Sequence, residues 1–182
     1  VCGCDSSWNA GSIVEDAAGL PFGRTLPGVL LDLVAAAVEK EFEPVALMTL
    51  LKHPLCRAGM AAGEMRRAIS ALELVAFRSP YFGKGLQGVE AALEGAKSRS
   101  WRHAAVRRLK DADWQAARDL LKRLVAIFAP IEKVFASAKP ASVHELARLH
   151  FATAQALAKS NDADDGSALR QGEAGEWAAL FF

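Results

Sequence analysis

The chain has 182 residues, 52% of them hydrophobic, and its 22 basic and 21 acidic side chains nearly balance. This length fits one domain or slightly more, with enough apolar content for a sizeable core, and the charge balance does not demand a polyanionic partner. Three cysteines cannot complete a disulfide framework, the first residues lack a signal-peptide pattern, and no apolar run is long enough for a membrane span. We therefore expect a cytoplasmic protein with no membrane partner.

The first third of the chain predicts a loop followed by two helices. Residues 13–15 could end a strand, and residues 16–24 are a loop rich in Gly and Pro. Apolar residues then recur at helical spacing, which predicts a helix from about Thr25 to Phe42 with a proline in its first turn. Pro44 opens a second, short helix that ends before Pro54.

The same periodicity predicts five further helices, over residues 61–77, 86–97, 111–128, 142–160 and 173–182. Asp111 or Asp113 is expected to cap the third of these, and Ser142 the fourth. Pro130 should either kink the helix that precedes it or start a new segment through Ala136. The expected fold is all-α, an irregular helical bundle, with a short β remnant at the N-terminus left open.

The most specific pattern lies between Glu15 and Met60. It comprises Glu-Asp-Ala-Ala-Gly-Leu-Pro at 15–21, Pro-Gly at 27–28, and a segment from Pro44 that closes with Lys-His-Pro-Leu at 52–55. These residues resemble the AddB-type subunit of the AddAB double-strand-break-repair helicase–nuclease, where a (D/E)DSAG-x-P loop leads to a P-(V/L)-x-LL-x-LLKHPL segment. The family-like structural positions are Gly19, Pro21, Lys52, His53, Pro54 and Leu55.

The resemblance implies a domain plan. Residues 13–60 would be the edge of a second RecA-like helicase domain, and residues 61–182 a helical subdomain inserted into it, whereas residues 1–12 match poorly. In this family the helicase-like half is inactivated as a motor, and the AddA-type partner drives unwinding. The chain is then expected to be a non-catalytic fragment without the ATP-binding core or the nuclease.

The residues themselves predict no catalytic, cofactor or metal site. The loop at 19–25 fails the phosphate-binding pattern because three residues, not four, separate its glycines and Arg24 replaces the lysine. The four histidines do not cluster at metal-ligand spacing. We expect His53 to cap or pack a helix end, since no paired base follows it.

A basic run is the one candidate binding site. Six cations and one aromatic residue lie within fourteen positions: Lys97, Arg99, Trp101, Arg102, Arg107, Arg108 and Lys110. Sites for nucleic acids combine such charges with stacking aromatics, although charge runs often just face solvent. DNA and the AddA-type subunit are therefore the expected partners, and a helical protein–protein adaptor with no DNA role is the alternative.

Overall fold

The computed structural model describes residues 21–78, 81, 83–98, 103–137, 139–161 and 163–181. This part of the chain is all-α and contains no strand, which confirms the predicted fold class. The strand end expected at residues 13–15 lies outside the described residues. The α-helices are α1 (Leu26–Glu39), α2 (Pro44–Leu51), α3 (Ala62–Leu72), α4 (Gly85–Ser98), α5 (Ala104–Arg107), α6 (Asp111–Phe135), α7 (Val143–Ala158) and α8 (Gly172–Phe181).

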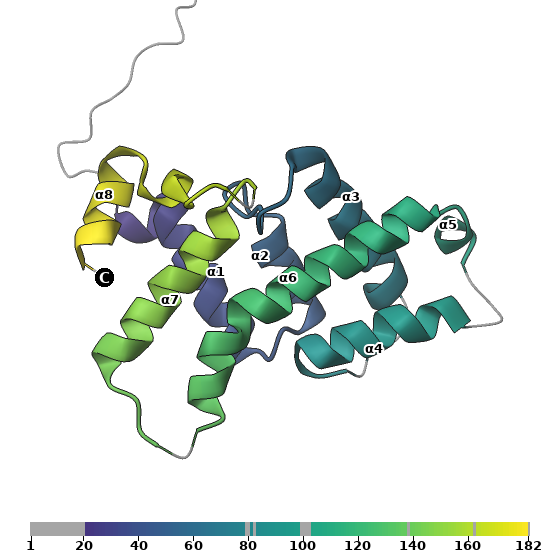
Figure 1. Cartoon of the computed structure of the whole chain (residues 1–182), viewed down its shortest axis with the longest axis horizontal. Coiled ribbons are helices and arrows are strands. Elements are labelled where there is room, and N and C mark those ends of the chain that lie inside the picture. The colour runs from purple at the N-terminus through teal and green to yellow at the C-terminus, as the bar shows by residue number, and fades with distance from the viewer. Residues whose placement is uncertain are drawn as a thin grey trace, which may run out of the picture.

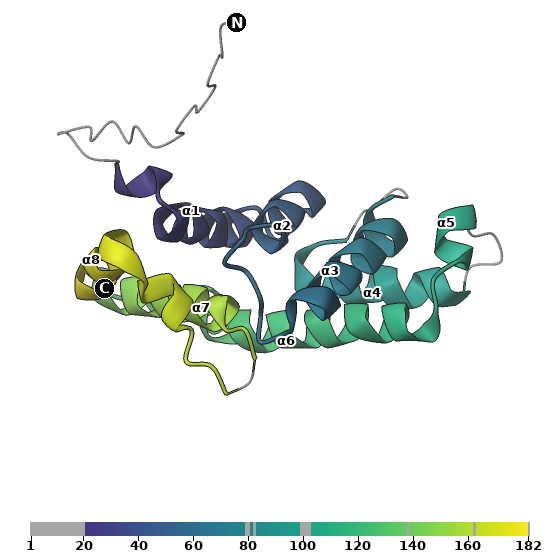
Figure 2. The same cartoon turned by 90° about the horizontal axis from the view of Figure 1, so that it is seen from above.

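The long helix α6 organises the molecule. It runs along much of the long axis, with α3, α4 and α5 at one end and α1, α7 and α8 at the other (Figure 1). Seen from above, α1 and α2 form a layer over α7 and α6 (Figure 2). Three short turns complete the arrangement: the 3-10 helices η1 (Phe22–Arg24) and η3 (Ser167–Arg170), and the π-helical turn η2 (Glu73–Phe77).

The core forms around the predicted apolar face of α6, whose residues are all buried: Trp114, Ala117, Leu120, Leu121, Leu124 and Phe128. Phe128 meets Phe42 edge-to-face, with ring centroids 4.8 Å apart, a favourable geometry for two aromatic quadrupoles. The buried residues on both sides of position 60 belong to one hydrophobic cluster. The boundary between residues 13–60 and 61–182 therefore stays a prediction taken from the family plan.

The start of α1 follows its local cap chemistry. The Thr25 hydroxyl oxygen accepts a hydrogen bond from the Gly28 N–H at 3.3 Å, and Pro27 occupies the first turn as predicted. The predicted end at Phe42 is wrong, because the helix stops at Glu39. The Phe42 N–H instead bonds back to the Ala37 carbonyl at 2.8 Å, and Glu41 adopts a positive φ of 49°. This Schellman closure turns the Phe42 ring into the core.

Two helices differ from the prediction in how they continue. Helix α6 passes through Pro130 to Phe135, so the predicted new segment at that proline is wrong. The proline ring removes the N–H that would bond to the Ala126 carbonyl, and α6 changes direction in its last turns (Figure 1). Helix α3 ends at Leu72 and passes directly into the π-helical turn η2.

Side chains cap two later helices close to where the sequence places the caps. The Asp113 carboxylate accepts from the Lys110 N–H at 2.8 Å at the start of α6. The Ser142 hydroxyl oxygen accepts from the Glu145 N–H at 3.1 Å at the start of α7. Both bonds satisfy backbone donors that a helix start leaves unpaired.

The C-terminal end of α7 is satisfied by a distant segment of the chain. The N–H groups of Arg57 and Ala58 both donate to the Leu157 carbonyl, at 2.7 and 2.8 Å, and the Gly59 N–H donates to the Lys159 carbonyl at 2.7 Å. These bonds fix α7 against the connection between α2 and α3, because buried carbonyls require partners. None of the helices in the described part of the chain has both the length and the apolar character of a membrane crossing.

Candidate nucleic-acid interface

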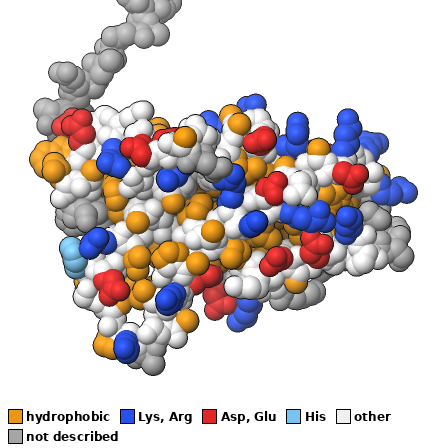
Figure 3. Space-filling model, viewed as in Figure 1, with side chains coloured by type: hydrophobic (Ala, Val, Ile, Leu, Met, Phe, Trp, Pro, Cys, Tyr) orange, Lys and Arg blue, Asp and Glu red, His pale blue; other side chains and the backbone are white. Residues whose placement is uncertain are grey.

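Basic side chains collect at the end of the molecule that carries α3, α5 and the start of α6. Figure 3 shows Lys and Arg side chains gathered over this end. Among the described residues, α3, α5 and the connection to α6 carry five exposed cations, which we call the basic end: Arg66, Arg67, Arg107, Arg108 and Lys110. Its members come from segments some forty residues apart, and the packing of α3 against α6 brings them together.

Ion pairs neutralise only part of this surface. Arg67 Nε lies 3.6 Å from the Asp113 carboxylate, and Arg118 Nε lies 2.6 Å from that of Glu94. The hydrogen bond to Arg118 holds the pKa of Glu94 below its usual value. Among the described residues, Arg107, Arg108 and Lys110 have no carboxylate within ion-pair distance. These three cations are therefore available to a polyanion.

The structure describes four of the seven predicted DNA-contacting residues. Arg107 ends α5, Arg108 and Lys110 lie between α5 and α6, and Lys97 lies in the last turn of α4; all four are exposed. Arg99, Trp101 and Arg102 lie outside the described residues. The run predicted from the sequence does not include Arg66 and Arg67, which are adjacent in a predicted helix; only the packing of α3 on α6 places them beside it.

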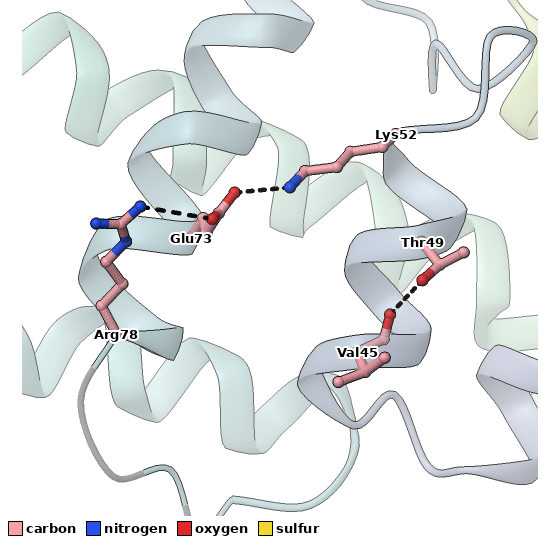
Figure 4. Close-up of polar contacts among 5 residues, drawn as sticks. All are labelled: Val45, Thr49, Lys52, Glu73 and Arg78. Carbon is pink, nitrogen blue, oxygen red and sulfur yellow. Dashed lines mark hydrogen bonds and ion pairs between the residues drawn. The ribbon is translucent and has the colours of Figure 1, made fainter.

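The family-like segment at 52–55 forms the end of α2 and its exit. The Lys52 ammonium donates to the Glu73 carboxylate at 2.9 Å, and Arg78 lies 3.9 Å from the other oxygen of the same carboxylate (Figure 4). Glu73 opens the π-helical turn, so this contact ties α2 to the end of α3. Thr49, one turn earlier, donates its hydroxyl to the Val45 carbonyl within α2 at 2.7 Å.

His53 lies next to this contact, and only 8% of its surface is exposed. Its Nδ1 accepts from the Leu55 N–H at 3.3 Å, and its Nε2 is buried with no hydrogen-bond partner in the described part of the chain. Burial lowers the pKa of this imidazole below 6.5. Pro54 is exposed, whereas Leu55 packs partly against the core. Pro21 stands just before η1, and Gly19 lies outside the described residues.

Cys56 behaves as an apolar core residue. Its thiol is buried, and burial raises its pKa to about 12, so the reactive thiolate is suppressed. Among the described residues, no three His, Cys, Asp or Glu side chains gather closely enough to hold a metal ion.

An apolar groove lies at the opposite end from the basic residues. Helices α1, α6 and α7 and the start of α4 border it, and its volume is about 1120 Å³. Phe135 at the end of α6 and Val143 at the start of α7 line it and are 66% and 84% exposed. Such a surface is costly to leave in water, so this groove is a second candidate binding surface.

In comparisons with known proteins, no family model, no curated protein and no solved structure matches this chain. The functional interpretation therefore rests on the sequence motifs and on the geometry of the two surfaces.

Proposed function

We propose that this chain is a non-catalytic helical subdomain of an inactivated superfamily I helicase-like subunit, of the AddB type, in a DNA double-strand-break-repair helicase–nuclease. Its basic end guides DNA, and its partner subunit is of the AddA type. The motifs at 15–21 and 44–55 support the family, and the basic end supports the DNA contact. A cytoplasmic location belongs to the same proposal.

The DNA contact is supported by the exposed cations of Arg107, Arg108 and Lys110, none of which has a carboxylate within ion-pair distance among the described residues. Exposed charges contribute little to folding stability even when they are paired. Folding stability therefore does not account for these three cations. A contact between such cations and DNA phosphates is more favourable in free energy, because binding also releases the counterions condensed on DNA. The partly paired Arg67 and the exposed Arg66 extend the same surface onto α3.

The test is fluorescence anisotropy of labelled single-stranded and duplex DNA with the whole chain, at low and at moderate salt. We expect binding that weakens as salt rises and that weakens again in the triple variant Arg107→Ala, Arg108→Ala, Lys110→Ala. Absence of binding at low salt would reject DNA guidance.

The alternative function is a helical protein–protein adaptor with no DNA role. The apolar groove between α1, α6 and α7 is the observation that favours it. The two functions use opposite ends of the molecule, so a variant at one end leaves the other surface intact.

A further inference from the structure

The groove between α1, α6 and α7 has a mainly apolar lining. Its floor and walls are formed mainly by Val34, Ala35, Val38, Phe42, Ile131 and Leu146. Apolar side chains of three helices face the same hollow. In a helical bundle, a further helix would occupy such a position. His150 also lines the groove, and a 2.8 Å hydrogen bond between its Nε2 and the Leu31 carbonyl oxygen holds α7 to α1.

The size of the groove favours a polypeptide occupant. Its volume of about 1120 Å³ exceeds the roughly 300–1,000 Å³ that is typical of small-molecule sites. On α7 the lining runs from Val143 to His150, which corresponds to roughly 11 Å of helix at 1.5 Å per residue. A guest helix of two to three turns, with apolar anchors at i, i+3, i+4 and i+7, fits such a surface.

The charges at the rim indicate which charge the flanks of the bound polypeptide carry. Three carboxylates, on Glu39, Glu41 and Glu132, border the groove against a single lysine, Lys84. Lys84 lies 3.6 Å from Glu41 and is thereby engaged. Within the described residues, Glu39 and Glu132 have no cation within ion-pair distance. The rim is therefore acidic and complements basic flanks on a guest helix.

We propose that this groove binds an amphipathic helix of a partner polypeptide, with its apolar face on Val34, Val38 and Leu146 and with Lys or Arg side chains against Glu39 and Glu132. This binding is separate from DNA contact, because the groove and the basic end lie at opposite ends of the molecule.

The probe is a labelled helix-forming peptide of about 15 residues, long enough to populate a helix, with Leu at i, i+3, i+4 and i+7 and Lys on the flanks. Anisotropy should show saturable binding by the whole chain. A peptide with Glu in place of each Lys, and one with the same composition in scrambled order, should bind at least about tenfold more weakly.

Ala35→Lys places a cation in the groove at an exposed helical position, where folding tolerates it. Ala152→Lys is the matched control, since Ala152 is exposed on α7 outside the groove. We expect Ala35→Lys to lose about tenfold or more in affinity and Ala152→Lys less than about twofold, with circular dichroism confirming that both fold.

Two outcomes would overturn the proposal. The first is equal affinity for the Lys and Glu peptides, or equal affinity of the Ala35→Lys and Ala152→Lys variants. The second is a concentration-dependent dimer in sedimentation, without peptide, that Ala35→Lys abolishes, because the groove would then belong to a second copy of this chain. If the whole chain binds the peptide but does not bind DNA, the DNA function alone is rejected.

Discussion

His53 shows how one buried side chain links stability to pH. Its Nδ1 accepts from the Leu55 N–H, its Nε2 is buried and unpaired in the described structure, and burial lowers its pKa. The unfolded chain binds a proton near pH 6.5, whereas the folded chain does so only at lower pH. The contribution to stability is therefore full above pH 6.5 and is lost as the pH falls from there toward the lowered pKa.

His53→Asn tests this linkage. Asparagine retains an acceptor for the Leu55 N–H, as in an Asx turn, but has no group that titrates. We expect an overall loss of about 1–2 kcal/mol from the smaller side chain, and a shallower fall in unfolding free energy between about pH 7 and about pH 5. Urea titrations at three pH values measure both quantities. An unchanged pH dependence would show that other groups cause it.

Asp164 should change the folding stability at a lower pH than His53 does. Its carboxylate accepts from the Ser160 N–H and hydroxyl, at 2.8 and 2.7 Å, and from the Gly166 N–H at 3.0 Å. These bonds lower its pKa from 3.8 to about 2. The stability that they contribute is present above pH 3.8 and is lost as the pH falls through about 2.

We expect Asp164→Ala to be less stable than the parent near neutral pH and to approach it near pH 2. Urea midpoints at about pH 6 and about pH 2 measure the difference. A difference of equal size at both pH values would contradict the assignment to a charged carboxylate.

At the scale of elements, helix starts were predictable from the sequence and some helix ends were not. Thr25 and Ser142 act on N–H groups three residues away, so the sequence alone carries those caps. The end of α1 depends on Phe42 docking against Phe128 and on the Gly85 N–H donating to the Glu41 carbonyl at 3.0 Å. Partners that distant in the chain do not appear in local periodicity.

The contact between η1 and α1 requires a glycine. A Cβ on Gly28 would overlap the Phe22 carbonyl oxygen, which is backbone and cannot turn aside. We expect Gly28→Ala to destabilise the fold by about 1–3 kcal/mol. Gly95→Ala in α4 is the matched control, because a Cβ there meets nothing within 4 Å, and it should stabilise by about 0.5–1 kcal/mol. Urea unfolding of both variants measures the two changes in stability. An increase in stability for both variants would contradict the close packing of η1 on α1.

At the scale of the whole molecule, a formal net charge of +1 does not reveal that exposed cations gather over α3, α5 and the start of α6 (Figure 3). The groove at the other end is bordered by Glu39 and Glu132, which have no cation within ion-pair distance in the part of the chain that the structure describes. The sequence predicted the run through Arg107, Arg108 and Lys110, because those residues are neighbours in the chain. It did not predict the addition from α3 or the groove, because both arise from helices that meet only in the folded state.

The salt dependence of DNA affinity tests the central proposal most directly. Each phosphate contact contributes about 0.9 to the slope of log affinity against log salt for duplex DNA, and about 0.7 for single strands. We expect Arg107→Ala, Arg108→Ala, Lys110→Ala to reduce the slope by about two to three. The control Lys133→Ala, Lys139→Ala, Arg148→Ala removes three exposed cations away from the basic end and should leave the slope unchanged. No binding at low salt, or equal slopes for both triple variants, would contradict a DNA-guiding role for the basic end.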